Sequence, residues 1–312
     1  MVKNDTIRDV GMADQALKID KARTPRGDLI GMVKKMISDW FVEEPCFKGH
    51  RIINQNPARG KMLRTLLVQR LCQASEQDFD MDALAFSCAA VELVHAATLL
   101  HDDVIDVGEV RRGEPALWRQ TSTSTSILVG DLFLCRAINF LTGTGPAKRI
   151  GYFIDKMHET CAAEISQELV FRGKALSEKE CLRIARKKTG PLFAFCAALC
   201  SNSEGSLEAA LEEAGYRIGT AYQLADDLID EKGDCNKSDK SLGTDRLRKK
   251  YTLARISSDQ EGYVKGLVNS LFASAEDLLA QWPSIHSGLH TYLEHDLYPV
   301  IFTQCDELRF SK

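Results

Sequence analysis

The chain has 312 residues, of which 44% are hydrophobic and 27% are charged, and its formal net charge is −4. This composition is typical of a globular protein with a sizeable core, and the acidic balance argues against a general nucleic-acid-binding protein. The sequence has 10 cysteines without paired spacing and no apolar secretory segment at its N-terminus, so we expect a cytoplasmic protein.

Helical periodicity dominates the chain, and alternating strands with Asn-Gly turns are hard to find. Residues 1–25 are polar and lack a period, which indicates a loose N-terminal tail. No linker rich in Pro, Gly or Ser divides the rest, so the sequence predicts one all-α domain over residues 26–312. Helices are predicted at about residues 28–42, from 61 onward, and at 81–107, 122–141, 147–172, 178–200, 206–231, 260–281 and 286–305. The segment "RRGEP" at residues 111–115 is predicted as a loop.

Two segments between or within these helices have a distinct character. The longest apolar stretch, residues 83–100, is interrupted by Glu92 and His95, which indicates a buried core helix and not a membrane span. Residues 233–251 form a long polar and charged loop, and long loops in compact domains are often functional lids.

Two helical segments repeat the same acidic spacing, "LLHDDVID" and "YQLADDLIDEKGD". The aspartates are Asp102, Asp103, Asp106, Asp226, Asp227 and Asp230. Positions i and i+4 share one face of a helix, so two such faces opposite each other would concentrate carboxylates that require cations. Oxygen ligands of this kind suit Mg²⁺, which is often shared with substrate phosphates. A solvated acidic face is the alternative, but it explains one copy better than two copies on apolar helices.

A phosphate-bearing substrate would need basic side chains for its other oxygens. The candidates are Lys61, Arg64, Arg111, Arg112, Lys188, Lys240 and Lys250. His95 lies two helical turns before Asp102 and therefore on the same face, although a satisfied core histidine is the alternative interpretation.

These motifs, in this order, resemble the trans-isoprenyl diphosphate synthases, or polyprenyl synthetases, over about residues 58–253. "VELVHAATLLHDDVID" followed by "RRGEP" is similar to the first aspartate-rich region of the family, and "YQLADDLIDEKGD" to the second. In "RGKMLR", Arg59 stands where the family usually has Gly and Met62 where it usually has a basic residue. The resemblance implies a single helical bundle of the isoprenoid synthase type around a deep central cavity, usually as a homodimer.

The resemblance also implies a reaction, the head-to-tail trans condensation of isopentenyl diphosphate with an allylic diphosphate. Isopentenyl diphosphate would be held by Lys61, Arg64, His95 and Arg112. The allylic diphosphate would be held by Arg111, Lys188, Lys240 and Lys250. Thr189 and Gln223 would face the developing carbocation. Three Mg²⁺ ions would be bound chiefly by Asp102, Asp106 and Asp226, with support from Asp103, Asp227 and Asp230. The loop over residues 233–251 would close over the diphosphates.

Product length in this family depends on residues below the first aspartate cluster. Ala97 and Thr98 are small and leave the way open to Val94 on the next turn, as in long-chain members. We therefore expect a product of six or more isoprene units, and a farnesyl or geranylgeranyl product is the alternative. Ordinary packing of small residues between helices is the alternative explanation of Ala97 and Thr98. A long product would be compatible with loose membrane association at release.

Two rival functions can be weighed from the sequence. A terpene cyclase would normally carry a different second metal motif and would not need Lys61 and Arg64. A non-catalytic regulatory subunit of a heteromeric synthase would tend to lose acidic or basic site residues, whereas this chain keeps both sets.

Overall fold

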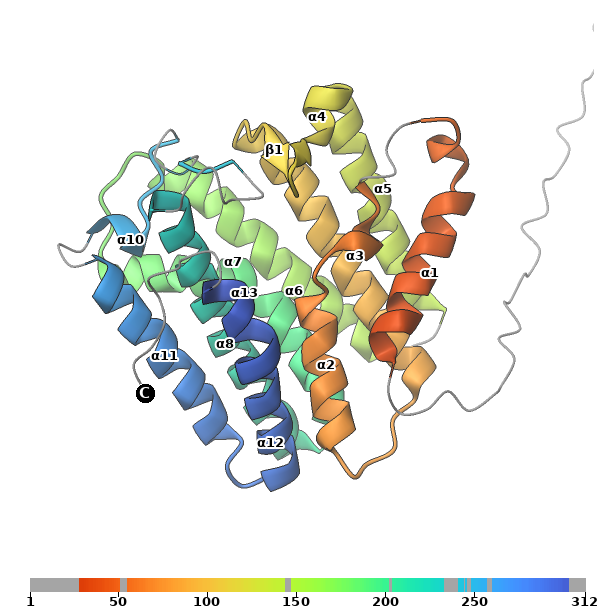
Figure 1. The fold of residues 1–312 in the computed structure, drawn as a ribbon, viewed down its shortest axis with the longest axis vertical. Coiled ribbons are helices and arrows are strands. Elements are labelled where there is room, and N and C mark those ends of the chain that lie inside the picture. Colours follow the sequence, from red (N-terminus) through yellow and green to blue (C-terminus); the bar gives the residue numbers. More distant parts are fainter. Residues whose placement is uncertain are drawn as a thin grey trace, which may run out of the picture.

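The computed structural model describes residues 28–50, 55–143, 147–201, 204–232, 241–243, 245, 248–256 and 260–302. Figure 1 shows them as a bundle of α-helices with a short β-hairpin at one end, which confirms the predicted all-α class. The long helices are α1 (Leu29–Glu43), α2 (Leu63–Ala74), α3 (Met81–Ile105), α5 (Thr123–Thr142), α6 (Ala147–Ser166), α7 (Glu178–Ala198), α8 (Gly205–Lys232), α11 (Gln260–Leu278) and α12 (Pro283–Tyr292). The short elements are η1 (Pro45–Phe47), η3 (Pro57–Arg59), β1 (Val110–Arg111), β2 (Glu114–Pro115), α4 (Leu117–Gln120), η4 (Gln167–Phe171), η5 (Leu199–Ser201), α10 (Leu253–Ile256), η6 (Leu293–Leu297) and α13 (Tyr298–Phe302).

The helix starts follow local capping chemistry. The Ser177 hydroxyl accepts a hydrogen bond from the Glu180 backbone N–H, and the Glu180 carboxylate accepts one from the Ser177 N–H, so α7 begins with a capping box. Asp80 caps α3 and Ser122 caps α5 in the same manner with a single bond. The sequence therefore determines where these helices begin, as expected for Ser and Asp at the N-cap.

Helices α7 and α8 pack at unusually short range, through glycines. A Cβ atom on Gly219 would lie 2.6 Å from the Cα of Gly190, and one on Gly215 would lie 2.6 Å from the Cα of Ala194. Only glycine permits such an approach of two helix backbones. As a consequence, Thr189 on α7 lies directly opposite Gln223 on α8.

The segment "RRGEP", predicted as a loop, forms the antiparallel hairpin β1–β2, in which Arg111 pairs with Glu114. Arg112 and Gly113 form its two-residue turn and both have positive φ angles, 55° and 72°. Two left-handed residues in succession produce the turn whose twist matches a hairpin, so the loop prediction was wrong here. The Ser241 hydroxyl accepts hydrogen bonds from the backbone N–H groups of Glu109 and Val110. It ties to this hairpin the described part of the predicted lid, residues 241–243, 245 and 248–251, which is called the lid segment below; its closure over a substrate stays a prediction.

The predicted helix boundaries differ from the structure mainly at C-terminal ends. Helix α3 ends at Ile105, because Val107 takes a left-handed conformation with φ 54°. The helices predicted at 147–172 and 286–305 each change to a π-helical turn, at η4 and η6. The predicted tail at 1–25 lies outside the described residues.

Two helices, α3 and α5, are long and apolar enough to cross a membrane by length and composition. In α3, 72% of the apolar window is buried inside the bundle, which confirms the prediction of a core helix. In α5 the corresponding share is 39%, so this helix leaves much of its apolar surface exposed.

Candidate active site

The first aspartate cluster lies at the C-terminal end of α3 and contacts the lid segment. Lys250, which is 3% exposed, donates a hydrogen bond of 2.8 Å to the carboxylate of Asp106. Arg248 lies 3.3 Å from the same carboxylate and also pairs with Glu168. Residues 248–250 are therefore held against α3 by ion pairs across 144 positions of sequence.

Asp103 faces away from this contact. It is 2% exposed, and its carboxylate accepts a hydrogen bond of 3.0 Å from Nε of Arg111 on β1. Burial alone would lower the pKa of Arg111, but Asp103 raises it above the ordinary value. Burial likewise raises the pKa of Asp103, and Arg111 acts against this rise. Asp103 thus anchors the hairpin, and its predicted role as a supporting metal ligand stays a prediction.

The second aspartate cluster on α8 is joined to α7 by a chain of hydrogen bonds. The Thr189 hydroxyl donates to the amide oxygen of Gln223, and the amide nitrogen of Gln223 donates to Asp227 at 2.7 Å. Asp230 accepts a hydrogen bond of 3.2 Å from the backbone N–H of Asp245 in the lid. This arrangement fixes the orientation of Gln223, with its nitrogen toward the acids.

Lys188 projects from α7 between the two clusters. It pairs with Glu164 at 2.7 Å, and its ammonium lies 3.5 Å from the amide oxygen of Gln167. Burial would lower the pKa of Lys188, but Glu164, followed by Asp102 and Asp245, raises it well above the ordinary value. Lys188 is therefore a permanent positive charge in the middle of the carboxylates.

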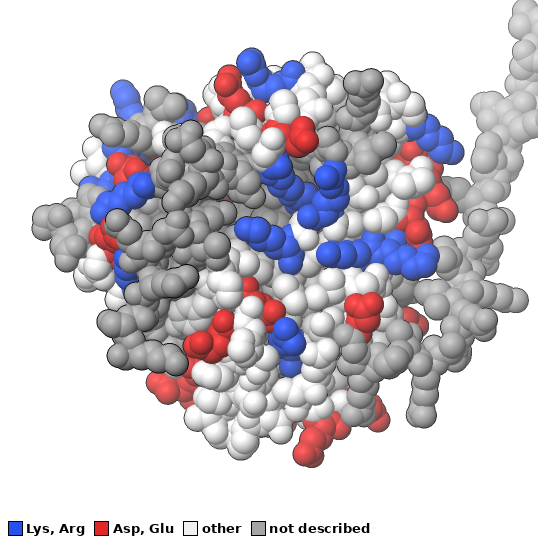
Figure 2. All heavy atoms as spheres, in the orientation of Figure 1, with Lys and Arg blue, Asp and Glu red and all other residues white. Residues whose placement is uncertain are grey.

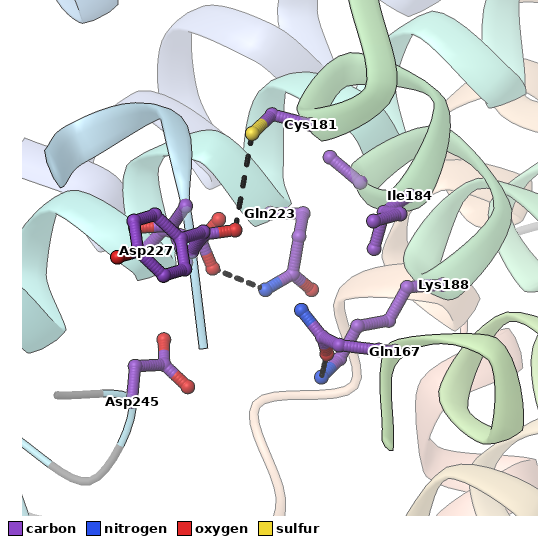
Figure 3. Close-up of a pocket in the computed structure, with 10 residues that line it drawn as sticks. Gln167, Cys181, Ile184, Lys188, Gln223, Asp227 and Asp245 are labelled. Carbon is purple, nitrogen blue, oxygen red and sulfur yellow. Dashed lines mark hydrogen bonds between the residues drawn. The ribbon is translucent and has the colours of Figure 1, made fainter. Parts of the chain in front are cut away.

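Lys188, Gln167, Gln223, Asp227 and Asp245 line a small hollow, whose volume of about 310 Å³ includes the open solvent at its mouth and the gaps between its lining atoms. Figure 3 shows Lys188 and Gln167 on one side of it, Asp227 on the other with Gln223 between them, and Asp245 below Asp227. The remaining lining residues are Cys181, Ile184, Ala185, Tyr251 and Thr252. The hollow thus combines an acidic mouth with an apolar wall on α7.

The two aspartate clusters share one electrostatic environment. Burial, followed by the charge of Glu164, raises the pKa of Asp102 from 3.8 to about 7. Burial, followed by Asp245, raises the pKa of Asp227 to about 8. The positive charge of Lys188 lowers the pKa of both carboxylates and so opposes part of this rise. The clusters predicted to face each other are therefore brought together in the structure.

The donor set fits a hard divalent cation. Carboxylates outnumber the basic side chains at the hollow, and buried carboxylates with raised pKa values gain from a cation. Among the described residues, however, no three His, Cys, Asp or Glu side chains converge to hold an ion as they stand. Asp103 and Asp106 are engaged with Arg111 and Lys250, so these side chains must turn to bind metal.

A separate basic cluster lies at the start of α2. Arg64 is buried, its guanidinium carbon lies 4.7 Å from the centre of the Phe193 ring, and its Nε atom has no hydrogen-bond partner among the described residues. The guanidinium of Arg112 lies against Gly60, next to the exposed Lys61. Figure 2 shows basic side chains gathered where Figure 1 places the start of α2. Burial, followed by Arg64, lowers the pKa of His95 well below its ordinary value, which makes His95 a neutral donor and acceptor.

The hairpin connects the two clusters. Arg111 bonds to Asp103 at the acidic cluster, and the adjacent Arg112 lies against the loop that carries Lys61. The structure therefore places two sites of opposite charge side by side. Arg111 contacts the acidic site, and Arg112 contacts the basic one.

The residues predicted to control product length lie in the core below. Val94 and Ala97 are 3% and 0% exposed, and neither lines the hollow. The Thr98 hydroxyl donates to the carbonyl of His95 within its own helix. Passage of a growing chain past Ala97 requires the surrounding side chains to move, and the open tunnel stays a prediction.

The structure also adds residues that the sequence reasoning missed. Glu164 near the end of α6 and Gln167 at the start of η4 are three positions apart and both contact Lys188, a spacing that could have been noticed. Asp245 is an isolated acid in the lid and carries no motif signal. Lys240, predicted to bind diphosphate, lies outside the described residues.

Comparison with known proteins gives a consistent family. A family model described as polyprenyl synthetase matches residues 49–273. A geranylgeranyl diphosphate synthase of Mycobacterium tuberculosis is 35% identical over 206 residues, 64% of this chain and 58% of that protein. An octaprenyl diphosphate synthase of Escherichia coli is 29% identical over 206 residues, 65% of this chain and 63% of that protein. The chain thus spans about three fifths of the length of these two relatives.

A solved structure of a related protein superposes on most of this chain. The polyprenyl synthase of Caulobacter crescentus, in complex with calcium and isoprenyl diphosphate, has a TM-score of 0.74 and 25% identity, and the match covers 85% of this chain and 92% of that one. The bundle therefore has the fold of prenyl synthases, as the motifs led us to expect.

Proposed function

The chain belongs to the polyprenyl synthetase family, and on this premise we propose that it condenses isopentenyl diphosphate with an allylic diphosphate, head to tail and in the trans configuration. The observation that carries the proposal is the pair of adjacent sites with opposite charge. The two aspartate clusters, with Lys188 at the hollow and Lys250 on Asp106, suit a metal-bound diphosphate, and the basic cluster with Arg64 suits a diphosphate without metal. Two diphosphate substrates with different metal requirements fit such an arrangement.

Mg²⁺ between the two aspartate clusters would neutralise the diphosphate that departs from the allylic substrate. Asp102, Asp106 and Asp226 are the residues we propose to hold it. The bound calcium of the Caulobacter crescentus structure supports a divalent cation here, and three ions are our expectation.

Side chains of this protein would perform the other tasks of the reaction. Half-buried Lys188, whose pKa is raised by the surrounding carboxylates, and buried Lys250 would stabilise the departing diphosphate, because packing and ion pairs already hold both side chains in place. We propose that the Gln223 oxygen, which is oriented by the Thr189 hydroxyl, and Thr189 itself face the developing allylic carbocation. The apolar wall of α7 excludes water that would quench this cation. The protein supplies no nucleophile, because the double bond of isopentenyl diphosphate attacks.

We propose a product of six or more isoprene units. The small side chains of Ala97 and Thr98 support this length, and the long-chain relative from Escherichia coli agrees with it. The geranylgeranyl synthase from Mycobacterium tuberculosis supports the shorter alternative. Loose membrane association at release of a long product remains part of this proposal.

We also propose that the chain acts as a homodimer through α5. Ile127, Leu128 and Ile138 are exposed on this helix, Leu128 by 66%. An exposed apolar strip of this kind is typical of an interface. The regulatory-subunit alternative is disfavoured because both charged clusters keep their side chains.

The test is a product assay with purified protein, Mg²⁺, labelled isopentenyl diphosphate and a series of allylic diphosphates, with products separated by length. A ladder that ends at six or more units supports the synthase and its proposed length. A stop at farnesyl or geranylgeranyl diphosphate keeps the reaction and refutes the length. No incorporation by folded protein with any primer refutes the reaction and favours the regulatory subunit.

A further inference from the structure

The start of α2 lacks a cap of its own. The N-cap position is Met62, which takes a left-handed conformation with φ 54° and ψ 38°, and its side chain makes no capping bond. A helix leaves its first backbone N–H groups without partners inside the helix, and a polar side chain usually accepts from them. Met62 cannot do so, because its thioether is only a weak acceptor.

Glu92 of α3 supplies the missing cap from across the bundle. Its carboxylate accepts a hydrogen bond of 3.2 Å from the backbone N–H of Thr65 and one of 2.8 Å from the Thr65 hydroxyl. Thr65, the third residue of α2, is fully buried, and Glu92 is also buried. A negative charge at this end of a helix is further favoured by the helix dipole.

A buried carboxylate in an apolar helix is costly, so its neighbours matter. Burial raises the pKa of Glu92, and Arg64 is the first charge that acts against this rise, with Arg112 also contributing. The two arginines of the basic cluster therefore lie near the same carboxylate that bonds to Thr65. Glu92 is thus tied to α2 by hydrogen bonds and to the cluster by charge.

The segment held in this way carries the basic cluster itself. Lys61 precedes the left-handed Met62, and Arg64 follows it by two positions, so the backbone at Met62 sets the direction of both side chains. We infer that Glu92 is a positioning residue that holds Lys61 and Arg64 in place for the diphosphate of isopentenyl diphosphate. This inference rests on the proposed function. It assigns a role to the carboxylate that interrupts the apolar run of α3.

The test separates the two substrates by steady-state kinetics of the full chain. Glu92→Leu removes the acceptor, and we expect the KM for isopentenyl diphosphate to rise by roughly tenfold or more, with the KM for the allylic diphosphate within about twofold. Glu92→Gln keeps an acceptor oxygen and should restore most of the wild-type KM. Thr65→Val removes one of the two donors at nearly constant volume, and it carries the test if Glu92→Leu does not fold.

Ser87→Ala is the matched control. Ser87 is a buried polar residue of α3 whose hydroxyl bonds only within its own helix, to the carbonyl of Ala83. This variant should leave both KM values unchanged. A parallel rise of both KM values in the Glu92 and Thr65 variants, or a loss of kcat alone, would overturn the positioning role. An inactive but folded wild-type chain would instead overturn the proposed function, and the inference with it.

Discussion

The close approach of α7 and α8 yields a prediction that connects stability with activity. In the variant Gly219→Ala, the new methyl group would lie 2.6 Å from the Cα of Gly190, 2.8 Å from its N and 2.9 Å from the carbonyl oxygen of Thr189. These neighbours are all backbone atoms, so no side chain can rotate away. Ordinary carbon contacts measure about 3.5–4.0 Å, so the helices must separate by about 1 Å.

The free energy of unfolding then changes through two opposing terms. Alanine is more favourable than glycine inside a helix by about 1 kcal/mol. Overpacking costs about 1–3 kcal/mol, and we use the upper end because the clash is with backbone. The net loss of about 2 kcal/mol corresponds to a decrease in melting temperature of roughly 4 °C for a domain of this size.

The same separation would move Thr189 relative to Gln223, which it now contacts by a hydrogen bond. A displacement of about 1 Å in a catalytic array can reduce the rate by about 100-fold. Thermal unfolding and the product assay measure the two effects. Gly151→Ala is the control, because Gly151 is exposed on α6 with no atom within 4 Å of a new Cβ, and it should stabilise by up to about 1 kcal/mol. A Gly219→Ala protein with wild-type stability and kcat would refute the argument.

Three further predictions address charge, product length and pH. Lys250→Met should reduce kcat by about 100-fold or more, because it would remove a buried cation from the proposed site of the departing diphosphate. Lys249→Met, at the exposed neighbouring position, is the control and should change kcat little. Equal effects of the two variants on kcat would contradict the role of Lys250. Ala97→Phe should shorten the product, which chain-length analysis would show, and an unchanged ladder would exclude Ala97 from the path. In metal-free protein, Asp102 and Asp227 have pKa values of about 7 and 8 against 3.8 in the unfolded chain, so the folded state binds more protons and stability should fall as pH rises from about 4 to 8. Thermal melts across this range should show the decrease, and Mg²⁺ should reduce it; a rise with pH would contradict the assignment.

Much of the fold could be predicted because helical periodicity and capping residues are local signals. The π-helical turns η4 and η6 could not, since one extra residue in a turn barely alters a hydrophobic period. The hairpin was missed because its turn depends on Arg112 in a left-handed conformation, which is uncommon for a residue other than glycine.

The candidate site likewise contains residues that local sequence patterns predict and residues that only the packing brings together. The repeated aspartates could be predicted because two copies of one spacing are visible in the sequence. Glu164 and Asp245 are single acids on other elements, and only the packing of α6 and the lid brings them to Lys188. The pairing of Asp103 with Arg111 likewise depends on the hairpin, which turns Arg111 back toward α3.

The ion pairs of the lid bear on how metal and diphosphate bind. A divalent cation on Asp106 alone would face Lys250 and Arg248 at the distances of the present ion pairs, and like charges at such range repel. A diphosphate removes this conflict, because its oxygens can contact the cation and both basic side chains at once. Metal binding without diphosphate must therefore displace residues 248–250, whereas joint binding keeps them in place. By linkage each ligand then raises the affinity for the other by the same factor, so we expect residues 248–250 to couple the binding of metal to that of diphosphate.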